Sequence, residues 1–375
     1  MNGVWAKLAR QDAFHASAPA HGQGPARIVM LADIGLPQCR KYRVEQPAEL
    51  WAKAGVGYDW ADFRDVQRSL SALQSASHLM LYRVQSGPLL EMYLYEARRL
   101  GLPVAYDIDD PLFSVPAYET YGNMAALPGA MKAHFLAEAP KYLAAMNQAD
   151  VITVSTPGLA THLRAFTHRP VLVRRNFADA ATWAAAEAAP PRAESGGFRL
   201  AFASGSMGHE ADFGLIRDCI SDFLAADRLR RLMVLGHFDA AHLPKAVQGQ
   251  IEIHGFADYA DYLALLAQAD CAVMPLLDDL FNGCKSAVRV LDAAAVGVVS
   301  VASDIGDMCA VIREGETGHL IGADGDWRAV LEKLAAQPAA TAAMGQAAQA
   351  HLRTQWDGQP TPPVTEPKLL DWAKG

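Results

Sequence analysis

The sequence predicts an α/β protein built from two doubly wound, parallel-sheet domains that face each other. Three observations carry this prediction. The chain has 375 residues, which is more than one ordinary hydrophobic core fills and about right for two. Short β-rich runs alternate with helical patterns along both halves, as they do in parallel sheets. A stretch poor in β-branched residues, 183–197, lies between the halves and indicates a linker.

The first half contains five short runs with the composition of buried strands. They are Arg27 to Ala32, Ser77 to Val84, Pro103 to Ile108, Val151 to Ser155 and Pro170 to Val173. Helical spacing lies between them, most clearly at Gly87 to Leu100, which Gly101 ends, and at His134 to Gln148. We therefore expect a Rossmann-like domain over 26–182, after an N-terminal extension over 1–25.

The second half repeats the alternation. Its expected strands are Phe198 to Ala203, Arg231 to Leu235, Ile251 to His254, Cys271 to Pro275 and Val298 to Ala302. A stripe of apolar residues at helical spacing, from Phe213 to Phe223, predicts a helix facing the core. We expect a second Rossmann-like domain over 198–345 and a C-terminal helix and tail over 346–375. Ligands of such sheets bind beyond the carboxyl ends of the strands.

Composition excludes several classes of function. The formal net charge of −8 argues against a general nucleic-acid binder, because phosphate backbones are held by clustered basic residues. The five cysteines are scattered without a Cys-x-x-Cys pair, so neither a disulfide framework nor a zinc site is predicted. No run approaches the roughly 20 apolar residues that cross a bilayer, and a signal-peptide pattern is absent. We expect a soluble, cytoplasmic protein.

The first residues fit a weak contact with the inner face of a membrane. Val4, Trp5 and Leu8 have the spacing of a short amphipathic helix that rests on a lipid surface. An ordinary surface helix or a frayed chain end fits the same residues more simply.

A glycine loop follows the first strand of the second domain and leads into the amphipathic helix. Such loops bind anions, because unpaired backbone N–H groups and the positive end of the helix dipole point into them. A diphosphate there would contact Ser204, Gly205, Ser206 and His209. A tight turn capped by Ser206 or Asp212 fits the loop equally well.

A second charged helix entrance begins at Lys285. We expect Ser286 to cap the helix and Gly297 to end it, with Arg289 and Asp292 on its polar edge. A lysine at this entrance would neutralise phosphate charge, and a carboxylate further along would hold ribose hydroxyls. The alternative is a surface ion pair between Arg289 and Asp292 beside a solvated lysine.

With these residues the sequence resembles the GT-B glycosyltransferases, in particular the large retaining group (family 4-like) with members in bacterial surface-glycan synthesis. The segments that carry the resemblance are Ser204-Gly205-Ser206, Asp270 to Pro275, Lys285-Ser286, Leu291-Asp292, Gly297, Ala302-Ser303-Asp304 and Glu316 to Ile321. The resemblance implies that Lys285 binds the diphosphate of a nucleotide sugar and Asp292 its ribose. It also implies retention at the anomeric carbon and no metal.

The sequence departs from this group at its signature, two glutamates separated by seven residues. Counting the same spacing back from Asp292 reaches Cys284, so the first acidic residue is absent and the second is shortened to aspartate. A non-catalytic nucleotide-sugar sensor is therefore one alternative, and a nucleotide-sugar epimerase of the same fold is another.

The first domain has no Gly-x-Gly-x-x-Gly after its first strand, which argues against a nicotinamide cofactor. A basic stretch stands there instead and would contact an anionic acceptor, or it is simply a charged loop before a helix. The residues predicted to bind the acceptor are Arg40, Tyr42 and Arg43 from this stretch, with Tyr118 and Tyr121 from the long loop Ser114 to Met131.

Three carboxylates crowd the end of another apolar strand, in Tyr106-Asp107-Ile108-Asp109-Asp110. Like charges so close raise one another's pKa, which indicates a functional role. A similar Tyr-Asp-x-Asp-Asp motif occurs in GT-B transferases of surface glycans. We predict that Asp110, or else Asp109, orients the acceptor hydroxyl or takes its proton. A metal site is the alternative for paired aspartates.

The function expected from the sequence is therefore sugar transfer from a nucleotide-diphosphate sugar to a hydroxyl of a glycan, a lipid-linked sugar or a protein. The nucleotide sugar is a substrate, and no cofactor or metal is expected.

Overall fold

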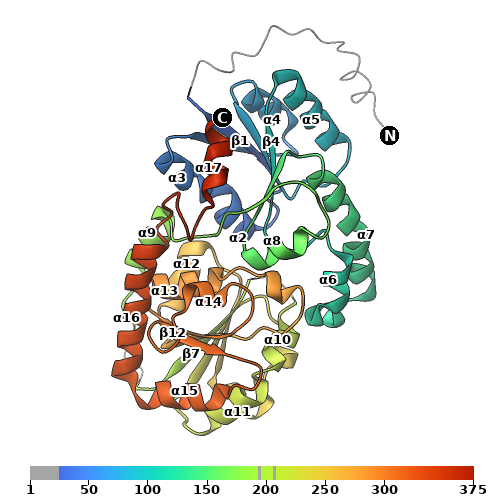
Figure 1. Cartoon of the computed structure of the whole chain (residues 1–375). Helices are drawn as coiled ribbons and strands as arrows, with labels where there is room; N and C mark the ends of the chain where they lie inside the picture. Colours follow the sequence, from blue (N-terminus) through green and yellow to red (C-terminus); the bar gives the residue numbers. More distant parts are fainter. Residues whose placement is uncertain (1–24, 193–195, 206–207) are drawn as a thin grey trace. The chain divides into compact units, whose positions relative to one another are not determined.

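The computed structural model describes residues 25–192, 196–205 and 208–375 (Figure 1). Within these residues the strands form two six-stranded sheets, in which all pairings of neighbouring strands are parallel. The two predicted Rossmann-like α/β domains are confirmed. The chain divides into two compact units, each with its own sheet. The first unit holds the described residues up to Tyr118, Ala130–Asn176 and Gly358–Gly375, and the second holds Glu119–Gly129 and Phe177–Asp357.

The sheet of the first unit has the order β2-β1-β3-β4-β5-β6. Its strands are β1 (Arg27–Ala32), β2 (Gly57–Asp62), β3 (His78–Tyr82), β4 (Val104–Ile108), β5 (Val151–Val154) and β6 (Val171–Val173). The five predicted strands are present, and β3 and β4 are buried along their whole length. The edge strand β2 was not predicted, because its sequence, GYDWAD, has no apolar run and is largely half-exposed.

Helices lie between these strands and at the end of the chain. They are α2 (Pro37–Cys39), the π-helical η1 (Arg40–Glu45), α3 (Pro47–Lys53), α4 (Val66–Leu73), α5 (Pro88–Leu100), α6 (Val115–Thr120), α7 (Gly129–Met146), α8 (Pro157–Leu163) and α17 (Pro367–Lys374). The predicted helix before Gly101 is α5, and Gly101 ends it in the left-handed conformation at φ 68°. Helix α7 begins five residues earlier than predicted, at Gly129 instead of His134.

The sheet of the second unit has the order β12-β11-β10-β7-β8-β9. Its strands are β7 (Arg199–Ser204), β8 (Arg231–Gly236), β9 (Ile251–His254), β10 (Cys271–Met274), β11 (Val299–Ser303) and β12 (Gly318–Ile321). The predicted strands are confirmed, and the segment Glu316 to Ile321, which carries part of the family resemblance, contains β12. The core of this unit is apolar and includes fully buried Phe202, Phe213 and Phe223.

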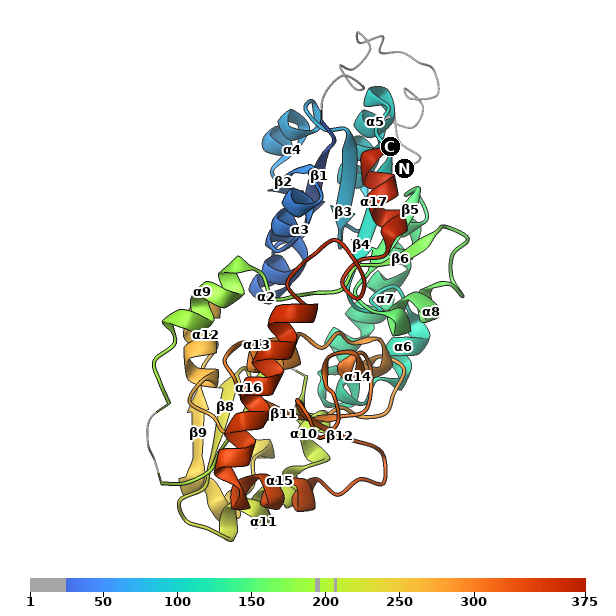
Figure 2. The same cartoon turned by 60° about the vertical axis from the view of Figure 1, so that its left-hand side comes forward.

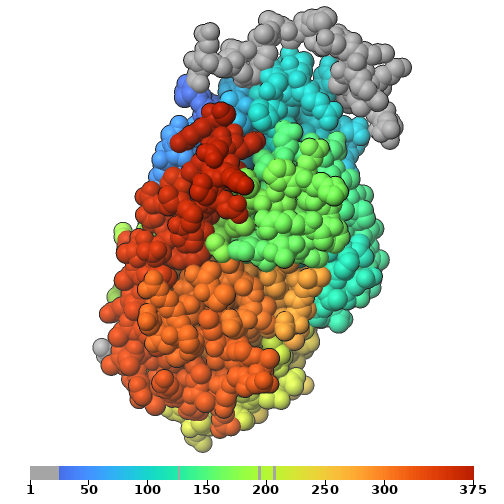
Figure 3. Space-filling view, viewed as in Figure 1, coloured from blue at the N-terminus to red at the C-terminus, as the bar shows by residue number. Residues whose placement is uncertain are grey.

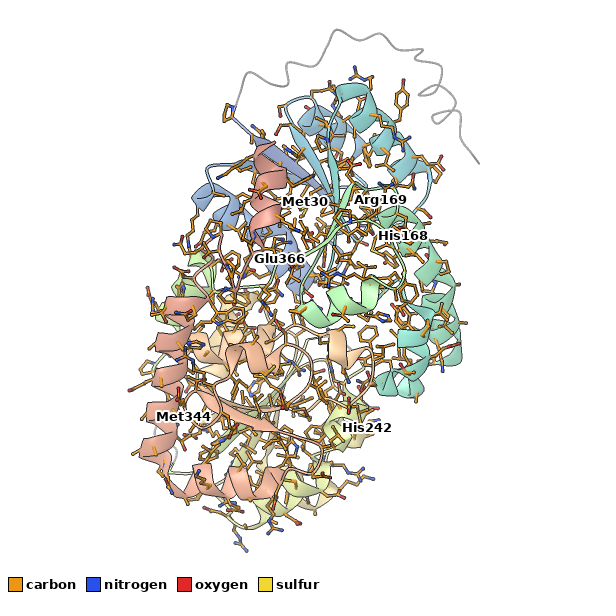
Figure 4. All side chains as sticks on the ribbon, viewed as in Figure 1. Met30, His168, Arg169, His242, Met344 and Glu366 are labelled. Carbon is orange, nitrogen blue, oxygen red and sulfur yellow. The ribbon has the colours of Figure 1, made fainter. Side chains whose placement is uncertain are left out.

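The helices of the second unit are mostly short. They are η2 (Gly122–Ala126), α9 (Ala180–Ala188), α10 (Glu210–Gly214), α11 (Arg217–Ala225), η3 (Ala240–His242), η4 (Lys245–Gln250), α12 (Tyr259–Leu266), η5 (Asn282–Cys284), α13 (Val288–Ala295), α14 (Met308–Val311), α15 (Trp327–Ala336) and α16 (Pro338–Gln355). The predicted helix from Phe213 to Phe223 is divided into α10 and α11, although its stripe is buried as expected. Met344 of α16 packs against the same core (Figure 4).

The predicted linker 183–197 is helical in its first part. Helix α9 covers it, begins at the cap residue Asp179, and packs against α12 (Figure 2). The run of alanines lacks β-branched residues, which suggested a loop, but alanine is also the strongest helix former.

The predicted C-terminal segment 346–375 is divided between the units. Its first part is the end of α16, whereas Gly358–Gly375 belongs to the first unit. There Val173 N donates to Glu366 Oε1 at 3.0 Å, Glu366 N donates to Val173 O at 3.1 Å, and Trp372 packs edge-on against His78. Glu366 is labelled in Figure 4, and the end of the chain is red in Figure 3. The short tail therefore caps the edge of the first sheet.

None of the described helices is long and apolar enough to cross a membrane. The segment that suggested a membrane contact, around Val4, Trp5 and Leu8, lies outside the described residues.

Candidate active site

A buried carboxylate, Asp212 of α10, organises one end of the sheet in the second unit. Its two oxygens accept hydrogen bonds from Leu277 N (2.9 Å), Asn282 Nδ2 (3.0 Å), Asn123 Nδ2 (2.8 Å) and His209 Nδ1 (3.2 Å). Burial raises the pKa of Asp212, but the hydrogen bond from His209 and the charge of Lys285 outweigh it and hold the pKa at about 2. Asp212 is therefore ionised and joins α10 to η2 and to the stretch 277–282 after β10.

His209, a predicted donor contact, lies against Asp212. Burial and the nearby charge of Lys285 lower its pKa to about 4, so the imidazole is neutral at physiological pH. Because Asp212 is ionised, we assign the ring proton to Nδ1, which donates to the carboxylate. The Nε2 atom is then a hydrogen-bond acceptor.

Lys285, the predicted diphosphate ligand, follows η5 and lies beside two aromatic rings. Its Nζ donates to Tyr121 OH at 3.0 Å and lies 5.1 Å from the centroid of the Tyr121 ring and 5.8 Å from that of Phe281. The two rings stack on each other at 4.2 Å. The ammonium thus contacts a hydroxyl and two aromatic faces.

The predicted anion site at the start of α10 differs from expectation. Ala211 N and Asp212 N donate to Asn123 Oδ1 at 3.1 and 3.2 Å, so a side chain already satisfies these two amides. The helix is also only five residues long, which gives it a small dipole. Two of the amides that were expected to be open are therefore occupied, and the anion site itself stays a prediction.

The backbone at the end of β7, before α10, is partly accessible. A Cβ added at Gly205 would meet no atom within 4 Å, so the backbone there is accessible. Ser204 is buried, and its hydroxyl donates to His237 O at 2.6 Å. Ser206 lies outside the described residues.

The polar edge of α13 is not a surface ion pair. Arg289 Nη1 donates to Ala203 O, at the end of β7, at 3.0 Å, and burial lowers its pKa. Asp292 is 3% exposed and accepts from Tyr259 OH at 2.8 Å. The alternative of a solvated Arg289–Asp292 pair is wrong, whereas the ribose contact of Asp292 stays a prediction.

The predicted cap of α13 also differs. The helix starts at Val288 and its N-cap is Ala287, without a side-chain hydrogen bond, so Ser286 does not cap it. Gly297 follows the helix in the left-handed conformation at φ 71°, as predicted for a residue that ends a helix.

In the first unit, the three carboxylates at the end of β4 each have cationic partners. Asp107 is fully buried, accepts from Arg43 Nη2 at 2.7 Å and Thr153 Oγ1 at 2.9 Å, and pairs with Arg174. Burial raises the pKa of Asp107, but the charges of Arg174 and Arg43 lower it below its usual value. Asp107 is therefore a structural ion.

Asp109 and Asp110 share one guanidinium. Arg83 Nε lies 2.6 Å from Asp109 Oδ1, and Arg83 Nη2 lies 2.7 Å from Asp110 Oδ2. Arg83 has a positive φ of 53°, which is costly for a residue with a side chain and aims it at this pair. The three carboxylates are crowded as predicted, but cationic partners compensate them, and the expected rise in pKa is wrong for Asp107. Asp110 keeps the more exposed side chain, 30% against 14% for Asp109.

Arg43 was predicted to bind the acceptor, but its side-chain N–H groups already donate to other atoms of the protein. Its N–H groups donate to Asp107, to Arg174 O at 2.7 Å and to Asn176 Oδ1 at 3.0 Å, and the side chain is fully buried. The charged stretch that contains Arg43 suggested an exposed loop. Its partners are more than 60 residues away in sequence, which hid the buried role.

The remaining predicted acceptor residues are not all brought together. Arg40 pairs with Glu45 at 2.7 Å and is 43% exposed, whereas Tyr42 is buried. Tyr118 stacks on Phe135 in the first unit, with centroids 5.7 Å apart. Tyr121 belongs to the second unit, where it contacts the predicted donor ligand Lys285.

Part of the second unit matches a known protein family. Residues 201–337, from β7 to the end of α15, match the family described as Glycosyl transferases group 1. The match contains His209, Asp212, Lys285 and Asp292. Among curated proteins, D-inositol 3-phosphate glycosyltransferase of Gordonia bronchialis is 40% identical over 70 residues, which is 18% of this chain and spans only 15% of that relative.

Solved structures match nearly the whole chain. Anabaena HepE, solved with UDP and glucose, superposes with a TM-score of 0.58 at 12% identity, covering 89% of this chain and 96% of that chain. The chain has the GT-B fold. Sucrose-phosphate synthase of Thermosynechococcus elongatus gives a TM-score of 0.55 at 14% identity, with 88% and 95% covered, and TarM gives 0.57 at 12%, with 82% and 58% covered. The resemblance to GT-B glycosyltransferases is confirmed.

Proposed function

We propose that this GT-B protein is a glycosyltransferase that binds a nucleotide-diphosphate sugar on its second unit and transfers the sugar to an acceptor hydroxyl. The observation that carries the proposal is the position of Lys285. It lies within the segment that matches Glycosyl transferases group 1, next to the neutral His209 and the ionised Asp212. A lysine at this position favours a diphosphate, because an ammonium forms charge-assisted hydrogen bonds with phosphate oxygens.

The donor contacts follow from this position. Lys285 would neutralise the diphosphate, and His209 Nε2 would accept from a hydroxyl of the donor. The accessible backbone at Gly205 permits close approach of a phosphate oxygen. A uridine nucleotide is the first donor to test, because HepE was solved with UDP and with UDP-glucose.

Sugar transfer also requires a side chain that contacts the acceptor hydroxyl. As the diphosphate leaves with the bonding electron pair, the anomeric carbon bonds to the acceptor oxygen, which passes its proton to the departing diphosphate. We assign Asp110 to the acceptor hydroxyl. Since Arg83 pairs with Asp110 and weakens it as a base, we favour orientation of the hydroxyl over removal of its proton.

Retention at the anomeric carbon and independence from metal belong to the same proposal. Lys285 supplies positive charge where a metal would otherwise stabilise the leaving diphosphate. Addition of EDTA should therefore leave the transfer rate unchanged, and a rate restored only by Mg²⁺ or Mn²⁺ would contradict metal independence. The acceptor remains a hydroxyl of a glycan, a lipid-linked sugar or a protein, within synthesis of a surface glycan.

A thermal-shift screen with UDP, ADP and GDP sugars tests the function. A ligand at 100 times its dissociation constant stabilises the folded state by about 2.7 kcal/mol, which is readily measured. We expect one nucleotide series to raise the melting temperature and its sugar to be released slowly to water. Stabilisation without any turnover would favour a sensor, and no stabilisation by any of the three would contradict the proposal.

A further inference from the structure

One short segment belongs to a different unit from the residues before and after it in the chain. Glu119–Gly129 groups with the second unit, although the chain before it, up to Tyr118, and after it, from Ala130, groups with the first. We call Glu119–Gly129 the strap. It contains η2 and comes from the loop predicted to shape an acceptor pocket.

Asn123 fixes the strap to α10. Its side chain is fully buried, and its side-chain amide both accepts and donates hydrogen bonds. Oδ1 accepts from Ala211 N and Asp212 N, and Nδ2 donates to Asp212 Oδ2 at 2.8 Å. Asn123 thus satisfies the first amides of the helix and also holds the carboxylate that orients His209.

Gly122 brings the strap close to the loop after β10. Its N–H donates to Asp279 Oδ2 at 3.1 Å, and a Cβ at this position would overlap Leu277 Cδ1. The lack of a side chain allows this approach, which places the next residue back, Tyr121, on Phe281.

Tyr121 contacts Lys285 directly. Its hydroxyl accepts from Lys285 Nζ at 3.0 Å, and its ring stacks on Phe281 at 4.2 Å with 15° between the planes. A lysine side chain has many rotamers, and holding its ammonium before a ligand arrives removes part of the entropy lost on binding. A hydroxyl does this without the negative charge that would compete with phosphate.

We propose that the strap is a built-in part of the donor site, in which Tyr121 and Asn123 are positioning residues for the diphosphate. Tyr121 holds Lys285, and Asn123 holds Asp212 and through it His209. The inference rests on the proposed function and adds to it that residues carried by the loop after β4 set the affinity for the donor's diphosphate.

Tyr121→Phe and Asn123→Ala in the full chain test this proposal by calorimetry. The probes are inorganic pyrophosphate, the nucleoside diphosphate that binds best among UDP, ADP and GDP, and its nucleoside. We expect Tyr121→Phe, which keeps the ring, to weaken both diphosphates about fivefold, the effect of roughly one lost hydrogen bond, and to leave the nucleoside unchanged. Asn123→Ala should weaken them further.

Tyr93→Phe is the matched control. Tyr93 is a buried tyrosine of the first unit whose hydroxyl donates to Phe63 O, so its loss should change stability but not binding. Wild-type affinity for pyrophosphate in Tyr121→Phe, or equal losses for nucleoside and diphosphate, would overturn the role of the strap while leaving the proposed function intact. No binding of any nucleotide by the wild type would overturn both. If Asn123→Ala does not fold, Tyr121→Phe decides alone.

Discussion

Asn123 and Asp212 are joined by hydrogen bonds in both directions, although 89 residues separate them in the sequence. Asn123 Nδ2 donates to the carboxylate at 2.8 Å, and Asp212 N returns a hydrogen bond to Asn123 Oδ1 at 3.2 Å. This reciprocal pair ties α10 to a segment whose chain neighbours belong to the other unit. Several measurable consequences depend on the carboxylate at its centre.

Asp212→Ala should destabilise the protein by roughly 3 kcal/mol or more. The substitution removes the acceptor of the buried Asn123 Nδ2 and of Leu277 N, and each hydrogen bond to a charged group is worth about 1.5–3 kcal/mol. Urea denaturation measures the free energy of unfolding. Asp218→Ala, at a nearby carboxylate with a 92% exposed side chain, should cost less than about 1 kcal/mol. Equal effects of the two would contradict the central role of Asp212.

Asp107→Asn should be more destabilising than any surface ion-pair substitution, by about 3–5 kcal/mol. It leaves Arg43 and Arg174 facing each other, fully buried, without their counterion. The comparison is Asp62→Asn, whose partner Arg64 is 52% exposed, and which should change the free energy of unfolding by less than about 1 kcal/mol. A small effect of Asp107→Asn would show that the network is solvated.

The stability of the protein should fall as the pH drops from about 6.5 to about 4. His209 has its pKa lowered from 6.5 to about 4, so the unfolded chain binds more protons in this interval and protonation favours unfolding. The contribution is on the order of 3 kcal/mol. His78, His162 and His351 also have lowered pKa values, so the slope must be compared with that of a variant. In His209→Asn the slope should be visibly smaller, and an unchanged slope would contradict a buried neutral His209.

Asp110→Asn should lower the transfer rate by roughly 100-fold, as expected when the acceptor hydroxyl is no longer held in place, while the affinity for the donor stays nearly the same. The amide keeps the size of the side chain but weakens its contact with Arg83 and with a hydroxyl. Steady-state kinetics and calorimetry separate these two effects. Unchanged turnover would remove Asp110 from the mechanism, and lost donor binding would indicate a structural role.

The elements of the fold that the sequence predicts best are those with continuous apolar runs. Strands such as β3 and β4, buried at every position, are easily recognised, whereas β2 alternates polar and aromatic residues and is missed. The alanine-rich sequence of α9 has no strand or turn pattern, so local sequence does not show whether it forms a linker or a helix. The return of Gly358–Gly375 to the first unit depends on long-range contacts that local sequence patterns do not contain.

The candidate site was predictable only where its residues follow strands. Lys285 and His209 stand in loops after β10 and β7, where ligands of such sheets bind. Asn123 and Asp212 were missed as a pair, because an asparagine in a loop has no pattern of its own and its partner is remote. Arg43 was misassigned for the same reason, since its partners Asp107 and Arg174 are distant in the chain.

Binding of nucleoside diphosphates to the wild type and to Lys285→Ala tests the central claim most directly. Calorimetry with UDP, ADP and GDP, each compared with its nucleoside, measures what the diphosphate adds to affinity. We predict that the wild type prefers one diphosphate over its nucleoside by at least about 10-fold and that Lys285→Ala loses most of this preference, whereas Lys141→Ala, at a lysine paired with Glu138 in the first unit, keeps it. No binding by the wild type, or an undiminished preference in Lys285→Ala, would contradict the account.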